Sequence, residues 1–344
     1  MKEEKSLIGV LNGEKGNPPP VWFMRQAGRY LPEYRELRAK VGSFWTMCND
    51  PAMAAEITLQ PIRRFGFDAA IIFSDILTVP YALGCNVKFT EGEGPSLPPI
   101  TSADGLDRDP AVWASKLAPA YETLGRVRGA LDGKTTLLGF AGAPWTLATY
   151  MAAGRGGDEQ RAAKLWGYRA PEDFDRLLDV LGDCVARHLM MQLEAGADAV
   201  QIFDSWASGL PDAQFDRWVI APTKKIVAQI RTVHPKAKII GFPRAATLAG
   251  YERYVRETGV DAISLDTATS MPWAVKTLGD KAALQGNLDP IALIAGGRAL
   301  REAVNVILTA TSGVPFIFNL GHGILPETPI AHVEELLKLV RGAA

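Results

Sequence analysis

The sequence predicts an α/β fold with one domain over residues 1–344, a (β/α)8 barrel, from three observations. Eight short apolar runs alternate with helical stretches, which is the pattern of parallel strands and the helices that cover them. The runs lack polar alternation, as strands buried on both faces do. No low-complexity tract or linker divides the chain. A doubly wound open sheet alternates in the same way and remains the alternative architecture.

The apolar runs give the expected positions of the strands. These are residues 21–24, 69–73, 136–140, 199–203, 238–242, 262–265, 282–285 and 315–318. A helix should begin at Pro51, after the capping residue Asp50, and end at Gly66. Further helices are expected at 171–196, 211–234 and 327–341.

One connection departs from this regular alternation. Residues 76–109 contain four prolines and four glycines with little periodicity. Connections of that length inside compact domains are often functional lids. Because this one directly follows the second expected strand, it is interpreted as a lid over a pocket.

The composition excludes several classes of partner. With 37 basic and 38 acidic residues, the chain has no net field that would attract nucleic acid or an anionic membrane. No apolar window approaches the ~18 residues of a membrane span, and the charged start does not resemble a secretory signal. The cysteines Cys48, Cys85 and Cys184 are odd in number and lack C-x-x-C spacing, which favours a reduced protein. We expect a cytoplasmic protein.

In a barrel the active site forms at the carboxyl ends of the strands, so these ends were searched in order. The first end is followed by the arginines Arg25, Arg29, Arg35 and Arg38. Arginine binds carboxylates in a two-pronged manner and keeps its charge. Arg35 fits an exposed helix face, whereas Arg25 and Arg29 flank Gly28, where backbone can approach a ligand. A substrate with several carboxylates is expected.

Acid–base candidates end other strands. Asp75 closes the apolar run 71–74 and is either a site residue or a helix cap. Asp204, Asp266 and Asp289 have comparable positions, so spacing does not choose among the four. His322 lies between two glycines after the last strand and is interpreted as functional. His188 and His332 are assigned to packing or to the surface.

Motifs for nucleotides and metals are missing. Residues 129–135 resemble a phosphate-binding loop but are one residue short, and they precede a strand instead of following one. No G-x-G-x-x-G follows an expected strand. No histidine has a cysteine two places on, so the His-x-Cys half of a thiolate zinc site is absent. We therefore expect no metal and no nucleotide cofactor.

Several of these segments resemble the uroporphyrinogen decarboxylase family. Residues 20–35, PVWFMRQAGRYLPEYR, are similar to its N-terminal signature, and 139–151, GFAGAPWTLATYM, to its second. Residues 73–77, 285–289 and 319–323 are similar to further family segments. Together they run in order from residue 20 to about 328. The long N-terminal and second signatures are specific to this family.

The resemblance implies a somewhat distorted barrel, a homodimer, no cofactor, and uroporphyrinogen as substrate. Such an enzyme converts the four acetate side chains to methyl groups, giving coproporphyrinogen. Carried over by position, the substrate would contact Arg25, Gln26, Ala27, Gly28, Arg29, Arg38, Asp75, Tyr150, Ser205 and His322. Asp75 would receive the pyrrole N–H groups, and Arg25 would assist catalysis. Ala153 and Trp206 depart from the family pattern and affect only local pocket detail.

Two alternative functions stay open at this stage. A corrinoid-dependent methyltransferase shares the fold but would need a zinc thiolate site, whose ligand spacing the sequence lacks. A tetrapyrrole carrier would bind the same ligand without turnover.

Overall fold

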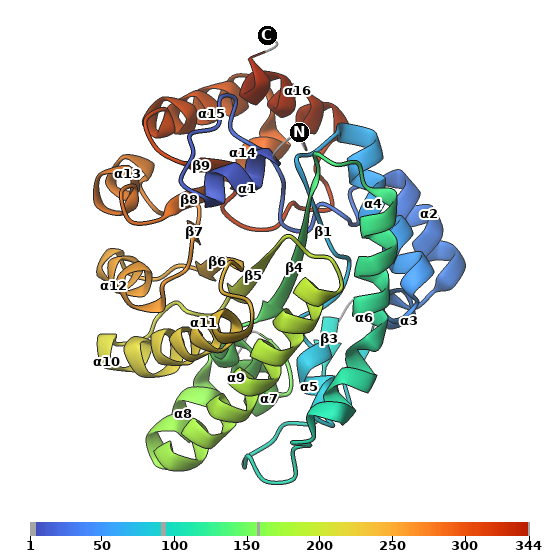
Figure 1. Ribbon diagram of the computed structural model, residues 1–344, viewed down its shortest axis with the longest axis vertical. Helices are drawn as coiled ribbons and strands as arrows, with labels where there is room; N and C mark the ends of the chain where they lie inside the picture. The colour runs from blue at the N-terminus through green and yellow to red at the C-terminus, as the bar shows by residue number, and fades with distance from the viewer. Residues whose placement is uncertain (1–4, 91–93, 157–158, 343–344) are drawn as a thin grey trace.

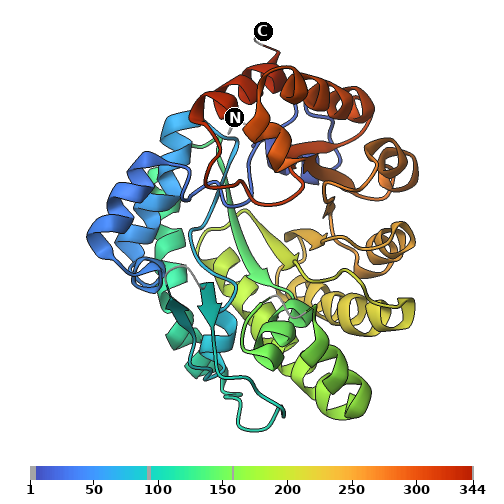
Figure 2. The same ribbon diagram turned by 180° about the vertical axis from the view of Figure 1, so that it is seen from behind.

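A curled parallel sheet forms the centre of the molecule in the computed structural model, which describes residues 5–90, 94–156 and 159–342 (Figure 1). Its seven strands have the order β1-β4-β5-β6-β7-β8-β9. They are β1 (Ala69–Ile71), β4 (Thr136–Gly142), β5 (Ala199–Asp204), β6 (Lys238–Pro243), β7 (Ala262–Ser264), β8 (Ala283–Leu288) and β9 (Phe316–Leu320). Helices surround the sheet, and the expected single-domain α/β barrel class is confirmed (Figures 1 and 2).

Only one of the eight expected strands is not a regular strand: the first, residues 21–24, is reduced to one isolated bridge. Val21 pairs in parallel with Phe318 of β9, and Trp22 N–H donates to the Phe318 carbonyl at 3.3 Å. On the other side, Asp68 N–H, just before β1, donates to the Val21 carbonyl at 3.0 Å. The segment therefore lies between β9 and β1 and closes the barrel. We call residues 20–26 the closing segment.

Side chains supply most of the remaining bonds of the closing segment, which is why it is not a regular strand. Phe23 N–H donates to Oε1 of Gln26 at 3.0 Å, and Met24 N–H donates to Oδ1 of Asn319 at 3.2 Å. The amide of Gln26 also donates to the Ala69 carbonyl of β1 at 2.8 Å. Both polar ends of this fully buried Gln26 side chain are thus used within the barrel wall.

The barrel interior is filled with side chains and covered at the strands' amino ends. Helix α1 (Ser6–Leu11) packs Leu7, Val10 and Leu11 against the first residues of the strands and lies in front of the sheet in Figure 1. Figure 2 therefore faces the opposite ends, where the strands finish. Inside, Gln285 accepts from the indole of Trp22 at 3.0 Å and donates to Gln201 at 3.1 Å. The interior is a packed core in which buried polar groups bond to one another, although the Gln201 amide nitrogen has no hydrogen-bond partner among the described residues.

Covering helices begin and end where capping chemistry dictates. Asp50 accepts the N–H groups of Ala52 and Met53, and Gly66, in the left-handed region, ends α4 (Pro51–Phe65). Other helices that cover the sheet are α6 (Pro110–Ala130), α9 (Pro171–Glu194), α11 (Ala221–Val233), α12 (Leu248–Thr258), α13 (Met271–Leu278), α15 (Gly297–Thr311) and α16 (Ile330–Arg341). The helix expected from residue 327 starts three residues later, because the residue before Pro329 is disfavoured in helical conformation.

The helix expected over 211–234 is composite. It contains α10 (Asp212–Phe215), one π-helical turn (Asp216–Ile220) and then α11. The structure also contains α2 (Pro32–Val41), α3 (Phe44–Asn49), α7 (Pro144–Ala153), α8 (Arg161–Arg169) and α14 (Pro290–Ala295).

The segment 76–109 has more regular structure than its composition suggested. It forms α5 (Thr78–Ala82) and a hairpin of β2 (Lys88–Thr90) with β3 (Gly94–Ser96). Its end is fastened to α7 and the following loop, because Leu97 N–H donates to the Gly154 carbonyl and Ile100 N–H to the Met151 carbonyl, both at 2.9 Å. Residues 91–93 of this segment lie outside the described residues. The lid interpretation stays a prediction.

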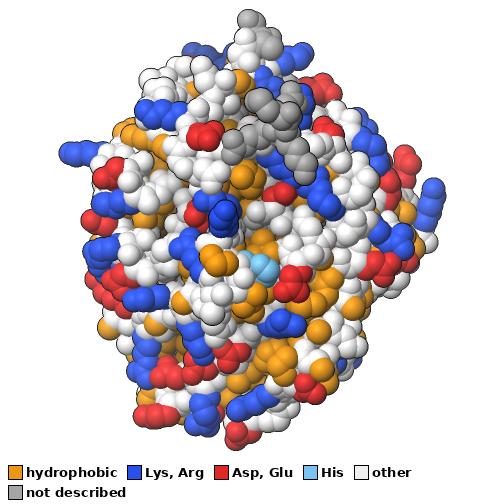
Figure 3. Space-filling model, in the orientation of Figure 1, with side chains coloured by type: hydrophobic (Ala, Val, Ile, Leu, Met, Phe, Trp, Pro, Cys, Tyr) orange, Lys and Arg blue, Asp and Glu red, His pale blue; other side chains and the backbone are white. Residues whose placement is uncertain are grey.

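The face seen in Figure 3 carries acidic and basic side chains interspersed with apolar ones. In the part of the chain that the structure describes, no helix is both long and apolar enough to cross a membrane.

Candidate active site

Side chains from three strand ends and from α7 interact electrostatically at one place, and Arg25 is at its centre. Burial raises the pKa of Asp75, after β1, and the nearby Arg25 charge opposes that rise. Arg25 acts in the same direction on Tyr150 of α7 and on His322 after β9. Because such effects fall off with distance, Arg25, Asp75, Tyr150 and His322 lie close together at the carboxyl ends of the strands. We call these four residues the Arg25 cluster.

Arg25 is held in an unusual conformation. Its φ is +63°, a left-handed value that non-glycine residues adopt rarely and often at functional sites. A Cβ atom added to Gly323 would collide with the Arg25 side chain, so only glycine leaves room for it beside His322. The exposed Arg25 side chain thus extends from the closing segment toward the end of β9.

The Asp75 carboxylate bonds to the backbone just before α5 but is not the N-cap of that helix, which is Leu77. One of its carboxylate oxygens accepts the Leu77 N–H at 2.8 Å, just before α5 begins. The same carboxylate raises the pKa of Tyr150 and of the buried Cys48 thiol, in both cases after the larger effect of burial. Asp75 therefore fastens the start of α5, and its charge acts on the other members of the Arg25 cluster.

Two of the other strand-end aspartates bond to local structure. Asp266 accepts from Ala245 N–H, from the Tyr251 hydroxyl and from Ala268 N–H, all between 2.7 and 2.8 Å. Asp289 caps α14 by accepting Ile291 N–H at 2.8 Å. These bonds explain both carboxylates through local structure.

Asp204 lies behind the pocket wall. Side chains alternate along a strand, and Phe203 of β5 belongs to the interior cluster, so Asp204 points outward toward the helices. Its carboxylate accepts the Thr146 hydroxyl at 2.5 Å, and that hydroxyl accepts Trp206 N–H at 3.1 Å. Burial raises the pKa of Asp204 to about 7. The network positions Trp206, whose ring meets Tyr150 edge-on at 6.2 Å between centroids.

Ser205 and His322 share a neighbour that sequence reasoning left out of the site, Arg244. Its Nη1 donates to the Ser205 carbonyl at 3.2 Å. Burial first, then the charges of Arg25 and Arg244, lower the pKa of His322 to about 4. His322 is therefore neutral near pH 7. The available signal in the sequence was the position of Arg244 after an expected strand. A single arginine at such a position does not by itself distinguish a site residue from a surface residue.

The remaining arginine-region candidates spread over the loop and α2. Arg29 is exposed, and its carbonyl accepts from Arg35 at 3.0 Å. Ala27 and Gly28, which lie between Arg25 and Arg29 in the sequence, are half-buried. Arg38 is half-buried, and one of its nitrogens is enclosed without a hydrogen-bond partner among the described residues. Burial raises the pKa of Cys48, the Asp75 charge adds to that rise, and the Arg38 charge opposes it. Arg38 and Asp75 therefore both lie near Cys48.

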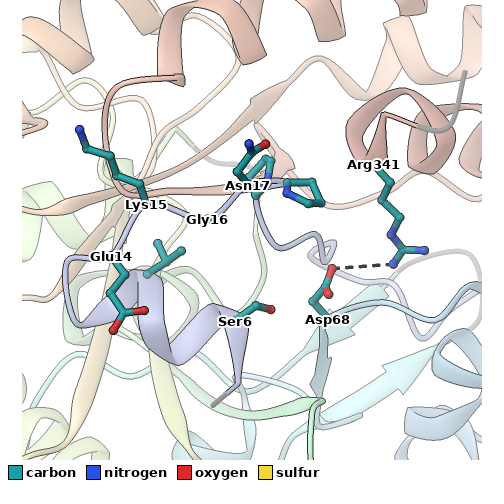
Figure 4. Close-up of a pocket in the computed structure, with 10 residues that line it drawn as sticks. Ser6, Glu14, Lys15, Gly16, Asn17, Asp68 and Arg341 are labelled. Carbon is teal, nitrogen blue, oxygen red and sulfur yellow. Dashed lines mark ion pairs between the residues drawn. The ribbon is translucent and has the colours of Figure 1, made fainter. Parts of the chain in front are cut away.

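A cavity of about 470 Å³ lies at the other end of the barrel (Figure 4). Glu14, Lys15, Asp68 and Arg341 are among the residues that line it, and Asp68 and Arg341 face each other at 3.8 Å. No candidate site residue lines this cavity. Over residues 5–90, 94–156 and 159–342, no three or more His, Cys, Asp or Glu side chains gather in a group that could hold a metal.

Comparisons with known proteins show the family and the fold. The family model "Uroporphyrinogen decarboxylase (URO-D)" matches residues 2–343. Curated uroporphyrinogen decarboxylases of Mesorhizobium japonicum and Chelativorans sp. are 54% and 53% identical, and the matches cover 100% and 98% of both chains, respectively. Among solved structures, a methyltransferase from Methanosarcina mazei has a TM-score of 0.82 at 20% identity over 99% of both chains, a likeness of fold. The chain belongs to the uroporphyrinogen decarboxylase family, whose members are carboxy-lyases of porphyrin biosynthesis.

Proposed function

We propose that the Arg25 cluster is the active site at which this chain decarboxylates the four acetate side chains of uroporphyrinogen III to give coproporphyrinogen III. The observation that carries the proposal is the meeting of a guanidinium, a carboxylate, a phenol and a neutral imidazole at the carboxyl ends of the strands. A substrate with eight carboxylates and four pyrrole N–H groups needs both cations and an anion. The cluster supplies both kinds of charge.

The substrate provides its own electron sink. Protonation of a pyrrole ring carbon creates a cation, and the electrons of the C–COO⁻ bond then move into it, releasing CO₂. The resulting exocyclic methylene carbon takes up a proton while the ring carbon loses one, which leaves a methyl group. The protein must therefore stabilise a positive charge that develops in the ring.

Asp75 is suited to that task. A carboxylate that faces the pyrrole N–H groups stabilises the cation through a fixed charge, an effect that favours the transition state. The Leu77 N–H and the Arg25 charge favour the ionised form of Asp75 against burial, which raises its pKa. Asp75 is the proposed catalytic anion and Arg25 its proposed catalytic partner.

The other candidates are proposed to bind and orient the macrocycle. Arg25, Arg29 and Arg38 bind substrate carboxylates, and the enclosed, unpartnered nitrogen of Arg38 suits such a contact. Ala27 and Gly28 let the backbone approach the ligand. Gln26 contributes by holding the closing segment on which Arg25 stands.

Tyr150, Ser205 and His322 are proposed to line the pocket. His322 is neutral near pH 7 and offers hydrogen bonds without adding charge. Segment 76–109 is proposed to cover the mouth, supported by its direct continuation from Asp75 and its attachment to α7.

We further propose a cytoplasmic homodimer without a cofactor. The family resemblance supports the dimer and the absence of a cofactor, and the balanced charge and thiol content support the compartment. Sedimentation analysis of the purified chain tests the oligomeric state.

Anaerobic incubation with uroporphyrinogen III, followed by oxidation and chromatography of the porphyrins, tests the reaction. We expect successive loss of four carboxyl groups. Recovery of unchanged uroporphyrin together with tight binding would instead identify a tetrapyrrole carrier.

A further inference from the structure

Arg244 stands on the wall opposite Arg25. Around the barrel the order is closing segment, β1, β4, β5, β6, β7, β8 and β9, so β6 is four places from the closing segment in either direction. Arg244 directly follows β6, and its N–H donates to the Asp204 carbonyl at 3.0 Å. Its side chain reaches the Ser205 carbonyl. Both bonds fix Arg244 against the end of β5.

The guanidinium of Arg244 lies at the carboxyl end of β5, where it donates to the Ser205 carbonyl at 3.2 Å. The charges of Arg244 and Arg25 both act on His322, although the two arginines come from opposite walls. His322 therefore lies within reach of both charges at the mouth of the barrel, where Figure 2 looks onto the strand ends.

The charge of Arg244 is not neutralised by the protein. Within the described ranges, no Asp or Glu oxygen lies within 4.0 Å of its guanidinium as an ion pair. The neighbouring carboxylates form no ion pair with Arg244 among the described residues. Asp204 accepts from Thr146 through Oδ1 while its Oδ2 is enclosed without a hydrogen-bond partner, and Asp266 accepts from Ala245 and Tyr251. A half-buried guanidinium with free donors is a binding site for an anion.

We propose that Arg244 binds a carboxylate of the substrate, on the side of the macrocycle opposite the carboxylate that Arg25 binds. This inference rests on the proposed function. The substrate ring carries carboxylates around its whole circumference. Two guanidiniums on facing walls of the barrel can therefore bind it at two separated points. Such a grip fixes the orientation of the ring over Asp75 as well as its affinity.

Two substitutions test the assignment. Arg244→Gln removes the charge, and Arg244→Lys keeps the charge but removes the planar fork. Arg253→Gln is the matched control, because Arg253 is also half-buried and on the next helix but pairs with Asp212 and Asp216 outside the barrel. Thermal unfolding and circular dichroism establish that each variant is folded, and a misfolded Arg244→Gln leaves the decision to Arg244→Lys.

The first readout is the pKa of His322, followed by NMR. In Arg244→Gln it should rise from about 4, because one of the two neighbouring cations is gone, while Arg244→Lys and Arg253→Gln leave it unchanged. An unchanged pKa in Arg244→Gln places Arg244 away from the pocket and overturns the inference.

The second readout is binding, measured by fluorescence titration with uroporphyrin, which carries eight carboxylates, and with coproporphyrin, which carries four. Loss of one charged carboxylate contact should weaken uroporphyrin binding and raise KM for uroporphyrinogen on the order of tenfold to a hundredfold. Weakening for both porphyrins identifies a propionate as the partner, and weakening for uroporphyrin alone identifies an acetate. Affinity within twofold of wild type for both overturns the proposal.

These titrations need no turnover, so they separate the two hypotheses. Wild-type protein that binds uroporphyrin but does not decarboxylate uroporphyrinogen contradicts the proposed function and leaves the role of Arg244 to be read from the variants.

Discussion

Replacing Asp75 with asparagine should nearly abolish turnover while leaving the protein folded. Asparagine keeps an oxygen that accepts the Leu77 N–H, the 2.8 Å bond that fastens the start of α5. The free energy of unfolding should therefore change by less than about 1 kcal/mol. What disappears is the negative charge beside Arg25, and loss of one such electrostatic contact costs roughly 2.7–4 kcal/mol of transition-state stabilisation, or 10²–10³ in kcat.

Asp289→Asn is the matched control for this substitution. Asp289 also follows a strand, caps the next helix through the N–H two residues on, and makes that bond at 2.8 Å. Kcat for uroporphyrinogen, the dissociation constant for uroporphyrin and the denaturant midpoint are measured for both variants. Near-normal kcat in a folded Asp75→Asn protein would refute the catalytic role and leave Asp75 with only its bond to the Leu77 N–H before α5. A loss of similar size in Asp289→Asn would show that capping explains the effect.

The remaining predictions concern binding, pH, the lid and metals. Arg25→Ala and Arg29→Ala should each raise KM on the order of tenfold or more, and high salt should reproduce part of the effect; unchanged KM in both excludes them from the site. Burial lowers the pKa of His188 to about 3, so the unfolded chain binds the extra proton and stability should fall as pH drops below 6.5, by on the order of 2–3 kcal/mol at pH 4.5. His188→Asn, which keeps an acceptor for the Tyr121 hydroxyl, should flatten denaturant midpoints against pH, and an equally steep curve contradicts this assignment. Bound porphyrin should protect segment 76–109 from proteolysis, whereas equal cleavage counts against a lid. Exhaustive dialysis against a chelator should leave turnover intact, and a loss that zinc restores would favour a metal-dependent reaction.

Much of the barrel could be predicted because its strands are continuous apolar runs. The runs at 136–140, 199–203 and 238–242 lie within β4, β5 and β6. The closing segment has the same apolar character, yet most of its N–H groups donate to side chains such as Gln26 and Asn319. The hydrophobic pattern of a segment indicates that it is buried, but it does not indicate which acceptor each backbone N–H bonds to.

The hairpin in segment 76–109 was missed for a related reason. Its strands are three residues each and lie among prolines and glycines. What holds β2 is an aromatic contact from another element, because Phe89 stacks on Trp45 of α3 at 5.2 Å. Local sequence does not reveal such a partner.

The site could be located from the sequence but its members could not be ranked. Searching the strand ends found Arg25, Asp75 and His322. It could not distinguish Asp75 from Asp204, since that depends on which face of the wall a side chain leaves, and the structure turns Asp204 toward Thr146. Tyr150 lies inside α7, away from any strand end, and entered only through the family resemblance.

The closing segment also has a consequence for how the chain is made. Its link to β1 joins residues 43 apart in sequence, from Gln26 to Ala69, whereas its link to β9 joins residues 295 apart, from Met24 to Asn319. During synthesis on the ribosome, one side of the segment therefore finds its partner early and the other waits for nearly the whole chain. Until Asn319 emerges, β1 and β4 to β8 can form only an open sheet with an unprotected edge, the kind of edge that recruits other chains. During that interval the unpaired edge exposes the nascent protein most to association with other chains.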